Sequence, residues 1–295
     1  GQDYYVQRVP GLPNDSRWLG QGATRLGLQG EINDPIIFNR ILKGKSPGGR
    51  TKLYQKSRNL KRRMAAVDLT FCSPKSLSLQ ALVQGDLDLI EAHREAVNYA
   101  IAFVEENYAV TRVMVKGNRS VVTTGNLVIA AFDHIDARSV APDKGAAADK
   151  ATIPDPHLHT HCLVMNLTEV REKSWYCIEN KNFYRNQMEI GGIYRQRLAQ
   201  NLQTLNYGII PRPKGLFDLE GYSDELIRHF SKRRRKILEK AGNNASPRQR
   251  DQAWAKTRHY KLPLLPEDLK NYWLEEVKEH GFVLPPIPKV QVTDN

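Results

Sequence analysis

The sequence holds few cysteines, no long apolar run and no leader-like start. Its three cysteines, Cys72, Cys162 and Cys177, are widely spaced and lack CxxC spacing, which argues against a disulfide framework and against a thiolate zinc site. No stretch approaches the roughly 18 apolar residues of a membrane helix, and the polar start shows no signal peptide. A reducing cytoplasm, with no membrane segment in the chain, is the expected setting.

Acidic residues are in the minority, and an initiating methionine is missing. Lys and Arg number 44 against 32 Asp and Glu, which gives a net charge of +12. Such an excess attracts polyanions, of which nucleic acid is the commonest; the alternative is that the charge only keeps the chain soluble. Because the sequence begins with Gly1, we expect an excised fragment or a processed product.

Periodicity of the apolar residues predicts a mixed helical and β region through most of the chain. The glycine-punctuated stretch 17–32 is expected to form loops and short turns. Helical spacing predicts helices at 35–43, 86–108 and 187–206. Apolar and β-branched runs predict strands at 65–71, 110–116, 120–134 and 159–168, with a surface insertion at 135–156.

The character of the chain changes near residue 222, after which only helices are predicted. Ser223 is expected to cap a helix that ends at Gly242, and a further helix is expected near 266–280. We therefore expect two domains, an α+β core over 1–221 and a basic helical subdomain over 222–295.

Histidines alternate in the stretch PDPHLHTHCLVMN, residues 154–166. In a β-strand, alternate side chains point to the same side, so His159 and His161 would share one face. Neutral imidazole is the commonest protein ligand of divalent transition metals. The competing interpretation is an exposed polar face opposite the apolar side of the strand, which carries Leu158, Cys162 and Val164.

A useful metal affinity needs a third ligand, and His134 is the candidate. It ends the run NLVIAAFDH, and antiparallel pairing of that run with 159–168 would bring the end of one beside the start of the other. Three imidazoles without a thiolate leave coordination positions open, which suits a catalytic ion better than a structural one. We therefore predict a metal site formed by His134, His159 and His161.

Two other histidines are assigned different places. His157 is approached through two prolines, and we expect a loop histidine near the site rather than a ligand. His93 falls between apolar positions of a predicted helix, where a surface or packing residue is expected.

Four motifs, in order along the chain, resemble those of one known family. They are RWLGQGATRLGLQG, DLTFCSPKSLSLQALVQGD, TTGNLVIAAFDH and DPHLHTHCLVMNLT. The sequence resembles the N-terminal domains of conjugative relaxases of the MobF class, the TraI/TrwC-like proteins, within the wider HUH endonucleases. The resemblance implies an α+β fold with a central antiparallel sheet flanked by helices, and a C-terminal helical extension, called fingers, that clasps DNA.

The activity that the resemblance implies is site- and strand-specific nicking of plasmid DNA at an origin of transfer, followed by strand transfer. A tyrosine would attack the phosphodiester and remain joined to the 5′ phosphate. His134, His159 and His161 match the three metal ligands of the family, with Mg²⁺ or Mn²⁺ expected and Zn²⁺ as the alternative. Single-stranded DNA and relaxosome accessory proteins are the implied partners, in the cytoplasm of a bacterium.

The tyrosines are where the sequence departs from the family. Tyr4 and Tyr5 match part of its tyrosine-rich start, but the family usually has two pairs, and this chain begins just before what resembles the second. Tyr4 would then be the secondary nucleophile, or the only one present. Asp68 matches a carboxylate beside the active site, and we expect it to orient a ligand histidine or to receive the tyrosine proton.

Cations are expected to bind the DNA backbone. Lys75 lies in the SPKS turn, close to the expected chemistry. A run of five cations occupies the region that resembles the fingers, and a solvated helix face is its competing interpretation. The run consists of Lys232, Arg233, Arg234, Arg235 and Lys236.

Two rival functions remain open at this point. One is a metal phosphodiesterase that activates water and leaves no covalent adduct. The other is a non-catalytic fragment that binds single-stranded DNA and lacks its primary tyrosine.

Overall fold

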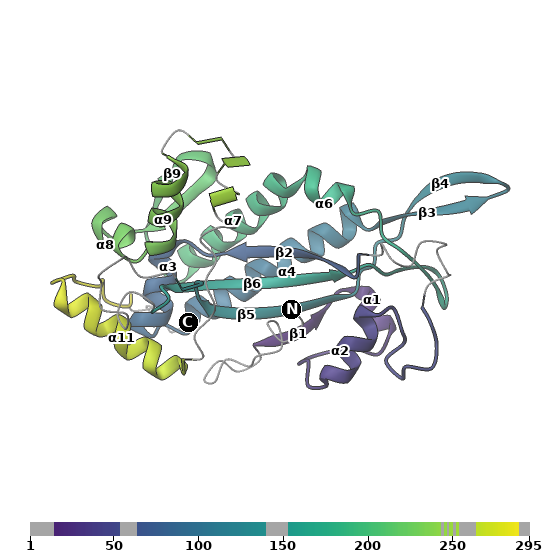
Figure 1. Ribbon diagram of the computed structural model, residues 1–295, viewed down its shortest axis with the longest axis horizontal. Helices are drawn as coiled ribbons and strands as arrows, with labels where there is room; N and C mark the ends of the chain where they lie inside the picture. The colour runs from purple at the N-terminus through teal and green to yellow at the C-terminus, as the bar shows by residue number, and fades with distance from the viewer. Residues whose placement is uncertain are drawn as a thin grey trace, which may run out of the picture.

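The computed structural model describes residues 15–53, 64–139, 153–242 and 264–288, together with 245–246, 248–249 and 252–253 (Figure 1). The predicted nucleophiles Tyr4 and Tyr5 lie outside the described residues, as does most of the predicted insertion. Within the described residues, no helix combines the length and the apolar character that crossing a bilayer requires.

A four-stranded sheet carries the candidate metal ligands. The strand order is β1-β5-β6-β2, and every pairing is antiparallel. The predictions of strands at 65–71 and 159–168 are confirmed, whereas the prediction of loops over 17–32 misses β1, whose whole length pairs with β5. The strands are β1 Ser16–Leu19, β5 Ile129–Asp136, β6 Pro156–Met165 and β2 Ala66–Cys72.

The single strand predicted at 120–134 is two strands. β4, Asn118–Thr123, pairs with β3, Val110–Val115, in a hairpin that projects from the body (Figure 1), and β5 begins only at Ile129. Between them Gly125 has a φ of 63°, which favours glycine. The Asn126 side chain holds this turn by donating to the carbonyls of Thr124 at 2.9 Å and Glu169 at 2.8 Å. The turn therefore interrupts an apolar pattern that reads as continuous.

Two long helices cover one face of the sheet. α4, Asp88–Tyr108, and α7, Gln187–Thr204, lie along it (Figure 1), close to their predicted bounds. Leu158 and Cys162 of β6 share one core cluster with Val97 of α4 and Leu198 of α7. Burial of each such aliphatic side chain stabilises the fold by roughly 1.5–3 kcal/mol, so this face is the main source of stability.

The opposite face of the sheet is divided into two halves. One half is covered by α2, Pro35–Leu42, whose Phe38 ring packs edge-on against Phe132 with centroids 5.4 Å apart. Asp34 caps this helix by accepting the Ile36 N–H at 2.7 Å. Leu163 of β6 is buried in the same cluster. The histidines of β6 lie on the other half, beyond the α2 cluster.

The helix predicted from Ser223 to Gly242 is two helices, α8 Asp224–His229 and α9 Lys232–Ala241. Ser223 caps α8 as predicted, by accepting the Leu226 N–H at 3.1 Å. The break follows from tertiary contacts, because Phe230 is fully buried in the main core and the Lys232 N–H donates to the Asp155 carboxylate at 2.7 Å. The helix predicted near 266–280 is confirmed as α11, Pro266–Glu279.

The C-terminal helices share a core with the sheet. Leu226, Phe230 and Trp273 belong to the same buried cluster as the strands, and the domain boundary at 221/222 stays a prediction. Shorter elements connect the parts described above: α1 Gln21–Arg25, α3 Lys75–Leu79, the π-helix Gln80–Gln84, α6 Lys181–Arg185, the 3-10 turn Pro213–Gly215, and the strands β7 Thr168–Arg171, β8 Ser174–Tyr176, β9 Ile209–Arg212 and β10 Leu216–Leu219.

Candidate metal centre and basic cleft

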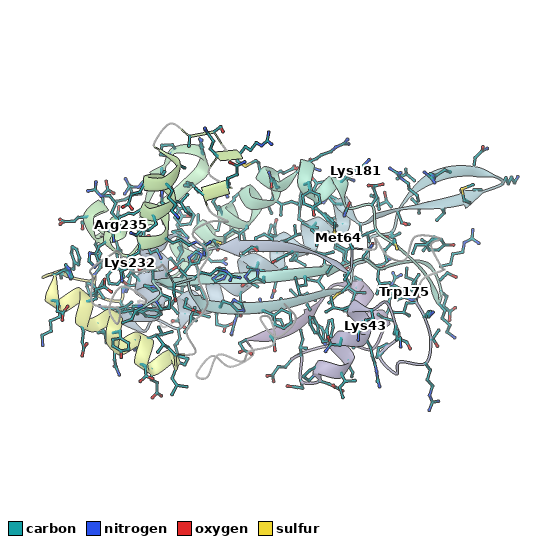
Figure 2. All side chains as sticks on the ribbon, viewed as in Figure 1. Lys43, Met64, Trp175, Lys181, Lys232 and Arg235 are labelled. Atoms are coloured by element: carbon teal, nitrogen blue, oxygen red, sulfur yellow. The ribbon has the colours of Figure 1, made fainter. Side chains whose placement is uncertain are left out.

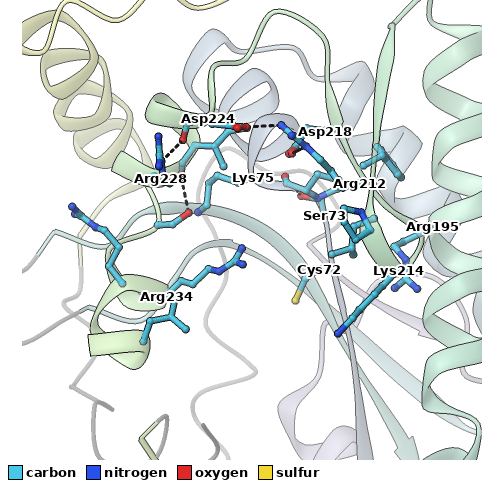
Figure 3. Close-up of a pocket in the computed structure, with 18 residues that line it drawn as sticks. Cys72, Ser73, Lys75, Arg195, Arg212, Lys214, Asp218, Asp224, Arg228 and Arg234 are labelled. Atoms are coloured by element: carbon cyan, nitrogen blue, oxygen red, sulfur yellow. Dashed lines mark hydrogen bonds and ion pairs between the residues drawn. The ribbon is translucent and has the colours of Figure 1, made fainter. Parts of the chain in front are cut away.

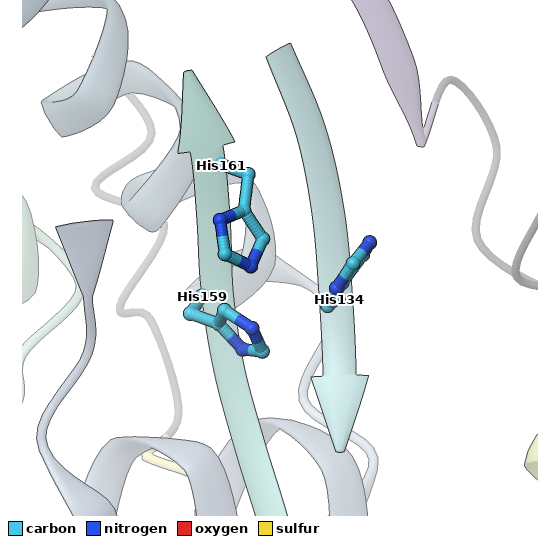
Figure 4. Close-up of side chains that lie close together, drawn as sticks. All are labelled: His134, His159 and His161. Atoms are coloured by element: carbon cyan, nitrogen blue, oxygen red, sulfur yellow. The ribbon is translucent and has the colours of Figure 1, made fainter. Parts of the chain in front are cut away.

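Three histidines converge on two neighbouring strands. His134 of β5 and His159 of β6 are direct partners in the antiparallel register, and His161 follows two residues along β6. The ring centroids lie 5.2, 5.0 and 5.1 Å apart, and the rings gather on one side of the strands (Figure 4). One nitrogen of each ring lies within 4.8 Å of the others. Among the described residues, this is the one such group of His, Cys, Asp or Glu side chains.

Hydrogen bonds orient the rings of His161 and His159. His161 Nδ1 donates to the Asp68 carboxylate, with 2.8 Å to Oδ2, and the Thr70 hydroxyl donates to the other oxygen of Asp68 at 3.2 Å. His159 Nδ1 donates to the His157 carbonyl at 2.8 Å. An imidazole that donates through Nδ1 keeps the lone pair of Nε2 for a metal. The structure therefore places Asp68 where it can orient a ligand histidine, one of its two predicted roles.

The donor set fits a divalent metal ion. Three imidazole nitrogens at this separation can share one ion, and a site with three protein ligands leaves coordination positions for substrate oxygens. Imidazole suits divalent transition ions, whereas Mg²⁺ prefers oxygen ligands. The predicted convergence of His134, His159 and His161 is thus present in the structure.

His157 and His93 lie in different surroundings. His157 belongs to β6, which begins at Pro156, so the expectation of a loop histidine is wrong; its ring stacks on His159 with centroids 4.7 Å apart. His93 is a packing residue, as expected, and is fully buried in α4. Its Nδ1 bonds to the Tyr194 hydroxyl and its Nε2 to the Thr160 hydroxyl, both at 2.8 Å.

A buried polar network lies directly behind the three clustered histidines. Thr160, between His159 and His161, faces the helices, and its hydroxyl donates to Asp133 at 2.6 Å. Asp133 also pairs with Arg17 at 2.9 Å and Arg94 at 2.7 Å. Burial alone would raise the pKa of Asp133, but these cations and the hydroxyl outweigh it and hold the pKa below its usual value. The network joins β1, β5, β6 and α4 behind the site.

A basic cleft of about 860 Å³ opens beside the free edge of β2. Cys72, the last residue of β2, lines the cleft and is the register partner of His159. The cleft therefore reaches the face of the sheet that carries the three histidines. Its walls come from α7, the β9–β10 hairpin, α8 and α9 (Figure 3). Cations outnumber acids along these walls: Lys75, Arg195, Arg212, Lys214, Arg228, Arg234 and Arg235 face Asp218 and Asp224.

The predicted DNA-binding cations have different surroundings. Arg234 and Arg235 are exposed and line the cleft, and Figure 2 shows Arg235 at the α9 end of the molecule. Arg233 is half-buried on the same helix. Lys232 binds Glu276 at 2.8 Å, and the Lys75 ammonium donates to the Pro156 carbonyl. Burial lowers the pKa of Lys75, so Lys75 and Lys232 are engaged within the protein.

Sequence reasoning missed several cations of the cleft. Arg195 lies on α7 one residue after the buried Tyr194, and its guanidinium donates to the Gly215 carbonyl at 3.0 Å. Arg212 and Lys214 lie in the stretch PRPKG of the β9–β10 hairpin. The concentration of cations in that stretch is the signal that could have identified them.

An antiparallel sheet that brings a His-x-His pair and a third histidine together, beside a cation-lined cleft, agrees with the site that the resemblance to HUH endonucleases implies. The profile of the TrwC relaxase family matches residues 1–280. The chain belongs to this family, and the resemblance to MobF-class relaxases is confirmed.

Known relatives agree with this assignment. The chain is 35% identical to the multifunctional conjugation protein TraI of Escherichia coli K12 over 290 residues, which make up 95% of this chain. The chain spans only 15% of the length of TraI.

Solved structures of a conjugative relaxase share the fold. TrwC in complex with oriT DNA, free of metal, has a TM-score of 0.83 at 32% identity and covers 96% of this chain and 94% of its own. A metal-bound complex gives 0.83 at 32% identity, with 96% and 95% covered. TrwC with a 27-mer DNA comprising the recognition hairpin and the cleavage site gives 0.81 at 33% identity, with 92% and 94% covered. The predicted α+β fold is confirmed.

Proposed function

We propose that this chain is the strand-nicking and strand-transferring domain of a conjugative relaxase, which acts on single-stranded DNA at an origin of transfer. The observation that carries the proposal is the triad of His134, His159 and His161 with Asp68 behind it and the basic cleft beside it. Its relative TrwC has been solved with DNA that includes a cleavage site.

The triad would hold the ion at the scissile phosphate. A bound divalent ion supplies polarisation of the non-bridging oxygens and stabilises the negative charge that grows in the transition state. Asp68 holds the His161 ring through Nδ1 and so keeps Nε2 aimed at the shared centre. Of the predicted ions, the all-nitrogen donor set favours Mn²⁺ or Zn²⁺ over Mg²⁺.

Tyr4, or Tyr5 beside it, is proposed as the nucleophile. Its Oη forms a bond to phosphorus, the bond from phosphorus to the 3′ oxygen breaks, the tyrosine proton passes to a base, and the leaving 3′ oxygen takes up a proton to become the 3′ hydroxyl. One phosphoester replaces another, so the step is nearly balanced in free energy and can run backwards. A reversible covalent link suits transfer of a strand end, which water attack would not preserve.

The cleft is proposed to take the single strand on its way to the triad. Binding of single strands needs backbone cations together with apolar surface for the bases, and the cleft offers Arg195, Arg234 and Arg235 beside Phe217 and Leu238. Relaxosome accessory proteins as further partners, and a bacterial cytoplasmic location, follow from the family and are part of the same proposal.

One assay separates the proposal from its rivals. The protein is incubated with Mn²⁺ and a pool of single-stranded oligonucleotides drawn from transfer origins of conjugative plasmids, and the products are resolved on a denaturing gel. A covalent protein–DNA adduct that disappears in Tyr4→Phe supports the proposal, with Tyr207→Phe as the matched control. Nicking without an adduct indicates a water-using phosphodiesterase. Binding without nicking indicates a fragment that lacks its nucleophile.

A further inference from the structure

Three consecutive residues just before the proposed metal ligands of β6 receive hydrogen bonds from three helices and from the segment that follows β5. The Trp273 indole of α11 donates to the Pro154 carbonyl at 2.8 Å. The Lys75 ammonium of α3 donates to the Pro156 carbonyl. Asp155 receives the backbone N–H of Lys232, the first residue of α9, at 2.7 Å on its carboxylate. Its own carbonyl receives the Ala137 N–H, just after β5, at 2.9 Å.

The sequence of this segment, Pro154–Asp155–Pro156, suits it to receive hydrogen bonds from several parts of the chain. Proline has no N–H and a fixed φ, so the two prolines present carbonyls in a rigid backbone and have no N–H that needs an acceptor. Asp155 is 4% exposed, and a buried carboxylate is stable only when it is paired. Burial raises the pKa of Asp155, and Lys75 nearby and the Lys232 ammonium, 3.5 Å from Oδ1, offset this only in part.

The contacts of Asp155 continue through α9 into α8 and α11. The Lys232 ammonium, which faces Asp155, also binds Glu276 of α11 at 2.8 Å. His229, at the end of α8, bonds to the same carboxylate at 2.7 Å. Two residues beyond Lys232, α9 presents Arg234 to the basic cleft. The chain of contacts therefore runs from the cleft through the start of α9 to Asp155, four residues before His159.

We propose that Asp155 is a positioning residue that couples binding of a single DNA strand along α9 to binding of the metal ion by the histidines of β6. This inference rests on the proposed function. A strand held by the cations of α9 fixes the start of that helix, the start of the helix fixes Asp155, and Asp155 fixes the first residues of β6. When the DNA strand is bound, the histidines are then already in the geometry that binds the metal ion. When the metal ion is bound, α9 is already in the geometry that binds the strand.

Coupling of this kind has a measurable form. If the oligonucleotide tightens Mn²⁺ binding by a given factor, Mn²⁺ must tighten oligonucleotide binding by the same factor. Such factors are typically about 5–150-fold. A residue that only stabilises the fold would change both affinities, or neither, and leave this ratio intact.

The test is a set of calorimetric titrations with Mn²⁺ alone, with a single-stranded oligonucleotide alone, and with each in the presence of the other. For the unmodified chain we expect Mn²⁺ to bind on the order of tenfold tighter with the oligonucleotide present. In Asp155→Ala we expect that ratio to fall to about one. We also expect kcat for nicking to fall, by a larger factor than KM changes. Asp155→Asn keeps an acceptor for the Lys232 N–H, protects the fold, and should give an intermediate ratio.

Asp34→Ala is the matched control, because Asp34 also accepts a backbone N–H at the start of a helix but does so on α2. It should leave the ratio unchanged. The inference is overturned if Asp155→Ala or Asp155→Asn keeps the full ratio, or if Asp34→Ala lowers it equally. Absence of Mn²⁺-dependent nicking in the unmodified chain would instead contradict the proposed function. Failure of the inference about Asp155 and failure of the proposed function can therefore be distinguished.

Discussion

The two faces of β6 differ in how their polar groups are used. On the face toward α4 and α7, Thr160 and its neighbours His93 and Asp133 are buried and bonded to one another. On the other face, His159 and His161 are oriented by their Nδ1 bonds toward a centre that they share with His134. One strand, through its alternation, therefore supplies stability with one set of side chains and chemistry with the other. Substitutions on the two faces should separate these effects.

The largest expected effect is loss of activity on the histidine face. His161→Ala removes one of the three proposed ligands, and a catalytic metal ion is worth several kcal/mol of transition-state stabilisation. We expect nicking to fall at least about a thousandfold, while the free energy of unfolding changes by about 1 kcal/mol or less. Gel assays and urea denaturation measure the two quantities. A large loss of stability without loss of nicking would contradict the comparison.

The next effect is loss of stability on the helix-covered face. Asp133→Ala leaves the Arg17 and Arg94 guanidinium groups, which it pairs at 2.9 and 2.7 Å, without that buried counter-charge. Breaking a buried pair destabilises by roughly 3–5 kcal/mol. Urea denaturation should show a drop of this size, and Glu172→Ala, which breaks the exposed pair with Lys173, should cost less than about 1 kcal/mol. An equal drop in both variants would show that burial is not the cause.

Acid should also act on the helix-covered face. Burial lowers the pKa of His93 to about 4, from 6.5 in an unfolded chain. Because the unfolded state takes up the proton first, stability is present above pH 6.5 and is lost as the pH falls toward 4, by about 2 kcal/mol between pH 7 and pH 5. His93→Gln should flatten this dependence in thermal unfolding. The exposed His280→Gln should not, and a flattened curve there would argue against His93.

Asp68 provides a further test of the comparison, on the face of β6 that carries the histidines. Asp68→Asn keeps the shape of the side chain but weakens the bond to His161 Nδ1, which is 2.8 Å long. Partners of metal ligands typically contribute about 10–100-fold in metal affinity or activity. We expect a loss of that order in Mn²⁺ affinity by calorimetry. Thr70→Val, which removes only the hydroxyl beside Asp68, should lose less, and the reverse order would contradict the orienting role.

The smallest expected effect concerns the cleft. Each cation that contacts a single strand contributes about 0.7 to the slope of log affinity against log salt. Arg234→Ala with Arg235→Ala should therefore flatten the slope by about 1.4. The control pair is Lys43→Ala with Lys52→Ala, on the α2 side of the molecule, where Figure 2 labels Lys43. Fluorescence anisotropy at several salt concentrations measures both, and equal slopes would place the strand elsewhere.

The parts of the structure that follow from local pattern could be predicted. Apolar spacing alone identifies α4 and α7, because their buried faces repeat over many turns. Alternation identifies His159 and His161 as neighbours on one face, and antiparallel pairing supplies His134. These features depend on residues close in sequence or on one pairing of two strong strands.

The parts that depend on distant contacts could not be predicted. The break between α8 and α9 requires Asp155, 77 positions away from Lys232. Lys75 and Lys232 look like DNA ligands in the sequence, yet their partners are Pro156 and Glu276. The edge of the cleft likewise combines residues from β2, α7 and the β9–β10 hairpin, which no single stretch of sequence brings together.

The direct pairing of His134 with His159 also sets an order of events during biogenesis. The rings come from two strands that are separated by an intervening segment, so a newly made chain offers three ligands to one ion only after the central sheet has assembled. If the three rings share one ion, as proposed, its uptake is a late step, and it favours the folded over the unfolded chain by mass action. A chelator should accordingly speed the loss of the assembled sheet at high temperature.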